Sequence, residues 1–87
     1  MSEVKLPTSV ELREALLQVL TRAPMGLSTK DIDQAVSTHL NLTTEQLAVI
    51  HSGNRTEIAY RLAWERTRAK SKGLIERTSA RMWKLAD

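Results

Sequence analysis

A short stretch near the end of the chain, KGLIERTSARMWKL, combines residues that bind phosphate with residues that pack into a core. Its four cations are Lys72, Arg77, Arg81 and Lys84. Arginine and lysine neutralise the phosphate backbone in most complexes of proteins with nucleic acids. Aliphatic residues and a tryptophan lie between these cations. The pattern is typical of an extended ribbon with an apolar side that docks and a basic side that binds.

Other chemistries find little support in the sequence. The 87 residues include no cysteine, which excludes disulfides, thiolate nucleophiles and thiolate zinc sites. His39 and His51 are twelve residues apart on different predicted elements, with no third ligand at a metal-site spacing. The only E-x-K spacing, Glu3-Val4-Lys5, has no upstream aspartate that could share a metal. We therefore expect no catalytic residue, no metal site and no cofactor.

Charge is unevenly distributed along the chain. Residues 1–50 carry four cations and six anions, a net −2, whereas residues 51–87 carry nine cations and four anions, a net +5. These two values add to the formal net charge of +3. A one-sided positive field suits a polyanion, although a solvated helix face is the simpler alternative. We favour double-stranded DNA as the partner.

Length and hydropathy limit the setting. The chain is long enough for one small domain over 1–87, in which we predict a flexible N-terminus over 1–7. The longest apolar run, Leu47-Ala48-Val49-Ile50, is far too short for a membrane-spanning helix. The N-terminus also lacks the apolar segment of a secretion signal. We expect a cytoplasmic protein with no membrane contact.

Capping signals predict two helices in the N-terminal half. Thr8 and Glu11 have the spacing of a capping box, which predicts a helix over 9–22. Ser28 opens a second helix, whose apolar stripe includes Ile32, Ala35, Val36 and Leu40. Leu27, immediately before this helix, is predicted to add one short strand pairing.

The C-terminal half is predicted to begin with a short helix over 44–50, which ends where HSGN breaks the pattern. A long helix follows from about 55 to 72, and Gly73 supplies the left-handed residue that commonly closes a helix. Strands over 74–78 and 81–85 then form a hairpin.

The predicted hairpin needs support from the helices, because an isolated hairpin is marginal in water. Trp83 and Leu85 alternate on one face of the second strand and would pack against the helices. Three helices, the last one long and basic, followed by a cationic hairpin give the element order of a winged helix-turn-helix. We predict this fold class, mainly α with a small β-hairpin and three to four helices plus the wing.

Helical geometry separates a core face from a binding face on the long helix. Ile58, Leu62 and Ala69 lie within about 40° of one another on the helical wheel and define the core face. Hydroxyls and small side chains on the opposite face can contact base edges. The predicted DNA-binding residues, from the second helix, the long helix and the wing, are Lys30, Asn54, Arg55, Thr56, Tyr60, Thr67, Lys70, Arg77, Arg81 and Lys84.

Trp64 has two alternative positions. It lies about 140° from the centre of the core face, on the side of the helix that also carries Arg61 and Arg68. Either the hairpin covers it beside Trp83, or it is exposed as a stacking platform. A buried indole is the commoner arrangement, so we expect the wing to cover Trp64.

Several short motifs, in their order along the chain, resemble the N-terminal domain of Mrr-type restriction proteins (type IV, modified-DNA systems). They are LPT at 6–8, SGNRT at 52–56, RLAW at 61–64, KGLIE at 72–76 and WKL at 83–85. The resemblance implies a winged-helix DNA-binding module, usually joined to a C-terminal endonuclease that cuts modified, often methylated, DNA. This sequence departs from the family at Arg81, where glycine is frequent, and no nuclease half follows within these 87 residues.

The expected function is target recognition in a restriction-type defence system against modified or foreign DNA. One alternative is a winged-helix module for protein–protein interaction or homodimerisation, and another is a small transcriptional regulator. Binding that depends on phosphates weakens steeply with salt, whereas an apolar interface does not, so salt dependence distinguishes DNA binding from protein interaction. We expect the chain taken alone to bind DNA and not to cut it.

Overall fold

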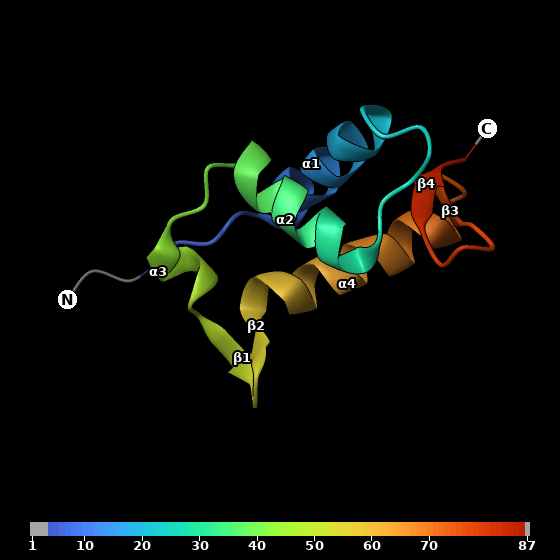
Figure 1. The fold of residues 1–87 in the computed structure, drawn as a ribbon. Helices are drawn as coiled ribbons and strands as arrows, with labels where there is room; N and C mark the ends of the chain where they lie inside the picture. Colours follow the sequence, from blue (N-terminus) through green and yellow to red (C-terminus); the bar gives the residue numbers. More distant parts are fainter. Residues whose placement is uncertain (1–3, 87) are drawn as a thin grey trace.

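The computed structural model describes residues 4–86, which form four helices and two small antiparallel sheets (Figure 1). The helices are α1 (Ser9–Thr21), α2 (Thr29–His39), α3 (Thr44–Leu47) and α4 (Glu57–Ser71). The strands are β1 (Ile50–Ser52), β2 (Arg55–Thr56), β3 (Ile75–Arg77) and β4 (Trp83–Leu85). This architecture confirms the predicted fold class, a mainly helical, winged-helix-like domain with a small hairpin.

Side-chain caps begin the first two helices where the sequence predicts them. The Thr8 hydroxyl accepts the Glu11 N–H at 3.1 Å, and a Glu11 carboxylate oxygen accepts the Thr8 N–H at 2.9 Å. These two bonds close a capping box and satisfy two backbone donors that the helix leaves free. Ser28 caps α2 with a single bond, in which its hydroxyl accepts the Asp31 N–H at 3.2 Å. The predicted bounds of α1, 9–22, and the predicted start of α2 at Ser28 are confirmed to within one residue.

An aliphatic core lies between α1, α2 and α4. The core face predicted for α4 is confirmed, because Ile58, Leu62 and Ala69 are all buried. They pack with apolar residues of the other two helices: Leu12, Ala15, Leu16, Val19, Leu20, Ile32 and Val36. Burial of this apolar surface supplies most of the driving force for folding.

The predicted wing is formed by β3 and β4, and a backbone pairing fixes it to the helices. Leu27 and Trp83 each accept the other's N–H, at N···O distances of 2.7 and 2.8 Å, which confirms the strand pairing predicted for Leu27. Gly26 has a φ of +96°, and a Cβ there would lie 3.0 Å from the Trp83 carbonyl oxygen. Only glycine fits this close approach without strain. The wing is therefore held at the start of α2 by its own main chain.

A second hairpin between α3 and α4 was not predicted. The short helix ends at Leu47 instead of residue 50, because Ile50 begins strand β1. β2 pairs with β1 across the two-residue turn Gly53-Asn54, and α4 therefore begins at Glu57 rather than residue 55. Gly-Asn between two short extended runs is a hairpin signal. The sequence interpretation treated the whole segment as a break and missed that signal.

The segment before α1 is packed where the structure describes it. Pro7 is buried, Leu6 packs against the core, and the Lys5 carbonyl accepts a hydrogen bond from the Gln46 side chain at 2.9 Å. Of the stretch predicted to be flexible, residues 1–3 lie outside the described residues, and Glu3 of the E-x-K spacing lies there too. Within residues 4–86, no helix has the length and apolar character needed to cross a membrane.

Candidate nucleic-acid interface

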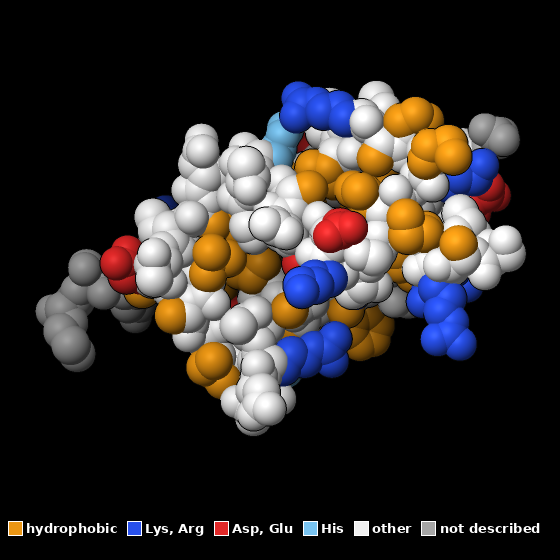
Figure 2. Space-filling model, viewed as in Figure 1, with side chains coloured by type: hydrophobic (Ala, Val, Ile, Leu, Met, Phe, Trp, Pro, Cys, Tyr) orange, Lys and Arg blue, Asp and Glu red, His pale blue; other side chains and the backbone are white. Residues whose placement is uncertain are grey.

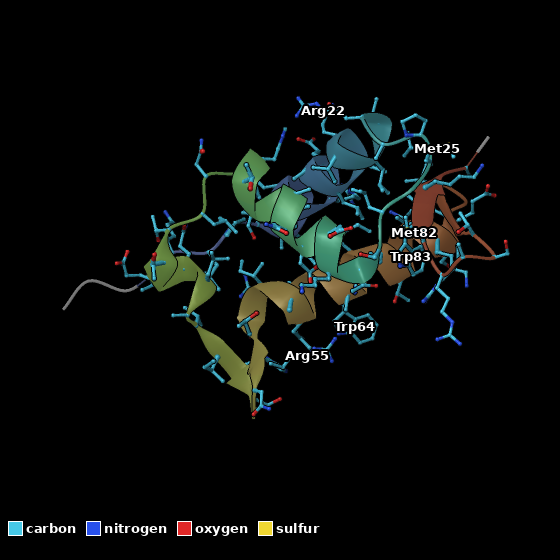
Figure 3. The ribbon with its side chains drawn as sticks, viewed as in Figure 1. Arg22, Met25, Arg55, Trp64, Met82 and Trp83 are labelled. Carbon is cyan, nitrogen blue, oxygen red and sulfur yellow. The ribbon has the colours of Figure 1, made fainter. Side chains whose placement is uncertain are left out.

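The outer face of α4 lies between the two hairpins. The β1–β2 hairpin directly precedes the first residue of the helix, and the β3–β4 wing follows the last turn of the helix (Figure 1). Arg55 from β2 and Trp64 from α4 project on the same side of the helix (Figure 3). Figure 2 shows basic side chains along this side of the molecule and at the wing. The surface thus combines one helix, two hairpin tips and a concentration of positive charge.

The elements that form this surface each contribute an arginine: Arg55 from β2, Arg66 from α4 and Arg77 from β3. Burial lowers the pKa of Arg66, and the positive charges of Arg55 and Arg77 act in the same direction, while the charge and hydrogen bond of Asp33 oppose them. Arg66 Nη1 is 3.2 Å from Asp33 Oδ1. Among the residues that the structure describes, Arg55 and Arg77 form no ion pair. These like charges repel one another in the free protein, and a bound anion would remove that repulsion.

The Asp33–Arg66 pair connects α2 to α4 beneath this surface. Burial raises the pKa of Asp33, while the charge and hydrogen bond of Arg66 act in the opposite direction. Arg66 is only 8% exposed. Sequence reasoning missed this pair, although Arg66 is only about 60° from the centre of the core face on the helical wheel. The pair is a direct side-chain contact between α2 and α4.

The predicted residues before α4 lie in the second hairpin instead of at the helix start. Asn54 and Arg55 are exposed, in the turn and in β2. The Thr56 hydroxyl accepts the Ala59 N–H at 3.2 Å and so caps α4. Arg55 Cζ lies 5.6 Å from the centre of the Tyr60 ring, which brings two of the predicted residues together.

The imidazole of His51 fixes the second hairpin against α4. It stacks on the Tyr60 ring with centroids 3.6 Å apart, and its Nδ1 is 2.8 Å from a Glu57 carboxylate oxygen. Glu57 also accepts a hydrogen bond from Arg61 Nε at 3.0 Å. Hydrogen bonds from Arg61 and, to a lesser extent, from His51 hold the pKa of Glu57 below its usual range. Tyr60 is therefore half-buried and held rigidly, not freely solvated.

The predicted wing residues differ in how free their charges are. Arg77 and Arg81 are exposed, and the Arg77 guanidinium lies 5.1 Å from the centre of the Trp83 ring. Lys84 Nζ is 3.4 Å from a Glu76 carboxylate oxygen, so a neighbouring anion partly offsets its charge. Arg81 has a φ of +62°, a conformation that favours glycine. Glycine, which is frequent at this position in the family that the sequence resembles, therefore fits the local backbone better than arginine does.

The remaining predicted residues are exposed on α2 and α4. Lys30 is in the first turn of α2, and Lys70 is in the last turn of α4. Thr67 is exposed on the outer face, where its hydroxyl donates to the Ala63 carbonyl at 3.0 Å. Among the described residues, none of these three forms a hydrogen bond or an ion pair with the arginines at this surface.

Trp64 is exposed, which corrects the expectation that the wing covers it. Its side chain is 48% exposed, whereas Trp83 is 7% exposed. The wing packs against α1 through β4 and against α4 through β3, and Trp83 pairs with Leu27. The wing therefore lies beyond the C-terminal turns of α4 and does not extend back over Trp64.

In the described part of the chain, no three histidine, aspartate or glutamate side chains lie close enough together to hold a metal ion. The arrangement is instead one of hydrogen-bond donors, cations and aromatic rings on a rigid helical support.

A mainly helical domain with a docked β-hairpin is compatible with the winged-helix-like class. The family profile described as the Mrr N-terminal domain matches residues 10–87, nearly the whole chain. The chain therefore belongs to that family, as its short motifs predict, and the family is an N-terminal domain rather than the nuclease domain. Comparison with curated proteins and with solved structures finds no match.

Proposed function

We propose that this domain binds duplex DNA through the outer face of α4 and the two bordering hairpins, as the target-recognition module of a restriction system. The observation that carries the proposal is the position of exposed arginines at both ends of that face, Arg55 on the β1–β2 hairpin and Arg77 and Arg81 on the wing. Exposed cations at both ends of one helix face suit a polyanion. The family membership supports the assignment to a restriction system.

The dimensions of α4 suit a major groove. The helix has 15 residues and is therefore about 22 Å long at about 1.5 Å per residue. A helix about 10–12 Å in diameter fits a groove about 12 Å wide. Ala63 and Thr67 are small, so the outer face of the helix can approach the base edges closely. Arg77 and Arg81 on the wing then reach the phosphate backbone.

A salt titration tests the proposal. If about four to five phosphates are neutralised, the logarithm of the association constant should fall against the logarithm of salt concentration with a slope of about −4. The measurement is fluorescence anisotropy with a labelled duplex at several salt concentrations. Absence of binding at low salt, or affinity that does not change with salt, would refute DNA binding and favour an apolar protein interface.

The wing is tested by the double variant Arg77→Ala/Arg81→Ala. Phosphate contacts carry little sequence information, so affinity should fall by a similar factor for all duplexes, and the salt slope should become smaller by about 2. Arg22→Ala is the matched control, because Arg22 is exposed on the side of the molecule away from Arg55 (Figure 3). Equal behaviour of the double variant and wild type would mean that the wing does not face DNA.

A further inference from the structure

An open cavity of about 300 Å³ lies along α4, on the flank adjacent to the proposed DNA-binding face. Most of its lining comes from α4, and Ser9 at the start of α1 completes it. Tyr60 and Trp64 border both this cavity and the outer face of the helix. A group that enters the cavity can therefore belong to a nucleic acid bound on that outer face.

Trp64 provides a flat aromatic wall for the cavity. Its neighbour Tyr60 meets it edge to face, with ring centres 6.5 Å apart and an angle of 77° between the planes. The Arg68 guanidinium lies 5.8 Å from the centre of the Trp64 ring. These contacts orient the indole while leaving it 48% exposed. An oriented, half-exposed indole is a suitable surface for stacking another ring.

Glu65 supplies a buried acceptor in the same cavity. This residue is 2% exposed, yet it lines the cavity wall. One carboxylate oxygen, Oε2, accepts hydrogen bonds from Ser9 Oγ and from Arg68 Nη1, each at 2.6 Å. The other, Oε1, has no hydrogen-bond partner among the described residues. A buried unsatisfied oxygen is costly, and an N–H donor on a ligand would satisfy it.

The charges around the cavity are balanced, which limits the class of ligand. Glu57 is paired with Arg61 at 3.0 Å, and Glu65 is paired with Arg68 at 2.6 Å. A cavity with two neutralised ion pairs selects neither a cation nor a small anion. It suits a neutral, planar ring that has N–H donors. The side chains of Arg61 and Arg68, 41% and 54% exposed, are placed to meet phosphates attached to such a ring.

We propose that this cavity binds an unpaired nucleobase, which stacks on Trp64 and donates an N–H to Oε1 of Glu65. Adenine and cytosine present an amino N–H in the major groove even when they are paired, so the N–H contact alone does not require an open pair. Stacking on Trp64 does, because the face of a base is covered by its neighbours until the base leaves the helical stack. The base comes either from a single strand or from an opened pair in a bound duplex. In the second case the inference rests on the proposed duplex binding.

The test compares three labelled DNAs by fluorescence anisotropy: a short single strand, a matched duplex and the same duplex with one mismatched pair. A mismatch lowers the cost of extruding a base. Wild type should bind the mismatched duplex about tenfold more tightly than the matched one, and Trp64→Ala should remove this preference. Trp64→Phe, which keeps a smaller ring, should retain part of it. The single strand should quench Trp64 fluorescence and bind Trp64→Ala about tenfold more weakly.

The outcomes separate this site from the proposed function. Trp64-dependent binding of the single strand without a mismatch preference supports the site and identifies single strands as the source of the base. If binding of the single strand and preference for the mismatch are both absent, or both persist in Trp64→Ala, the nucleobase site is overturned. The salt slope on the matched duplex decides duplex binding independently. Thermal unfolding of both variants confirms that they are folded.

Discussion

Leu62 and Thr67 are five residues apart on α4, and the structure gives them opposite surroundings. Leu62 is completely buried between the helices, whereas Thr67 is exposed and forms only a local hydrogen bond. Leu62→Ala should lower the free energy of unfolding by about 2–5 kcal/mol, because it leaves a cavity in the core. Thr67→Ala should change it by no more than about 0.5 kcal/mol but alter the preference among DNA sequences.

Urea unfolding of both variants and binding to a panel of duplexes provide the measurements. A large loss of stability in Thr67→Ala with a silent Leu62→Ala would show that the helix is rotated from this arrangement. The set of residues assigned to the outer face would then be wrong.

Arg81 carries a backbone strain that a glycine would relieve. Its φ of +62° costs a non-glycine residue about 1–2 kcal/mol. Arg81→Gly removes this strain and should raise the free energy of unfolding. The increase should be at most about 1 kcal/mol, because glycine loses more chain entropy on folding and this loss offsets part of the gain. Arg81→Ala is the control, because it removes the same charge and keeps the strain. Both variants should weaken DNA binding equally, and a glycine variant no more stable than the alanine variant would contradict the strain.

At the scale of elements, the attachment of the wing depends on Gly26. A Cβ at this position would lie 3.0 Å from the Trp83 carbonyl oxygen and 3.1 Å from the Met82 Cβ. Gly73 also has a positive φ, +75°, but a Cβ there would meet nothing within 4 Å. Gly73→Ala should cost about 1–2 kcal/mol through backbone strain alone. Gly26→Ala should cost clearly more, because the wing must also move away from the segment before α2.

Urea unfolding gives both free energies, and proton exchange of the Leu27 and Trp83 amides reports the pairing directly. Faster exchange at these amides is expected in Gly26→Ala and not in Gly73→Ala. Equal stabilities of the two variants would show that the close approach at Gly26 does not limit wing docking.

The second hairpin is held by a contact that depends on pH. The pKa of Glu57 is held below its usual range by hydrogen bonds from Arg61 first and from His51 second. A carboxylate with a lowered folded pKa contributes stability above the ordinary value, about 4.3, and loses it as pH falls through the folded value. Glu57→Gln should therefore be less stable than wild type at about pH 7 and equally stable at about pH 2. An unchanged difference between the two pH values would rule out this linkage.

The sequence predicts elements well where one or two residues decide them. Thr8, Ser28 and Gly73 each fix a helix end through a local bond or dihedral angle, and the periodicity of Leu62 and its neighbours fixes the core face. The prediction was wrong where the position of a side chain depends on contacts between elements that are far apart in the sequence. The exposure of Trp64 depends on where the wing docks, and that is set by the pairing of Leu27 with Trp83.

The candidate site shows the same division. Exposure of Arg77 and Arg81 follows from the hairpin pattern and was predicted. The position of Arg55 beside the outer face of α4 depends on the β1–β2 hairpin, whose Gly-Asn signal was read only as a break. The buried Asp33–Arg66 pair joins two helices, and single-helix periodicity gives no direct information on such a contact.

At the scale of the whole molecule, the two halves of the chain that differ in net charge form different elements. The C-terminal half, with its net +5, forms α4 and most of the hairpin surface, whereas the net −2 of residues 1–50 is carried largely by α1, α2 and their flanks. Under the proposed function, this uneven charge would accelerate encounter with DNA and orient the domain before contact.

Duplex DNA should also stabilise the fold. A ligand that binds only the folded state adds about 2.7 kcal/mol at a concentration of 100 times its Kd. For a domain of this size, that corresponds to a rise in Tm of roughly 10–20 °C. The measurement is circular dichroism of the helices in low salt, with a duplex that melts well above the protein. High salt should remove the rise, and the Arg77→Ala/Arg81→Ala variant should show a smaller one, while Arg22→Ala should match wild type. A Tm that stays constant in saturating duplex at low salt would mean that Arg55, Arg77 and Arg81 do not form a DNA-binding surface.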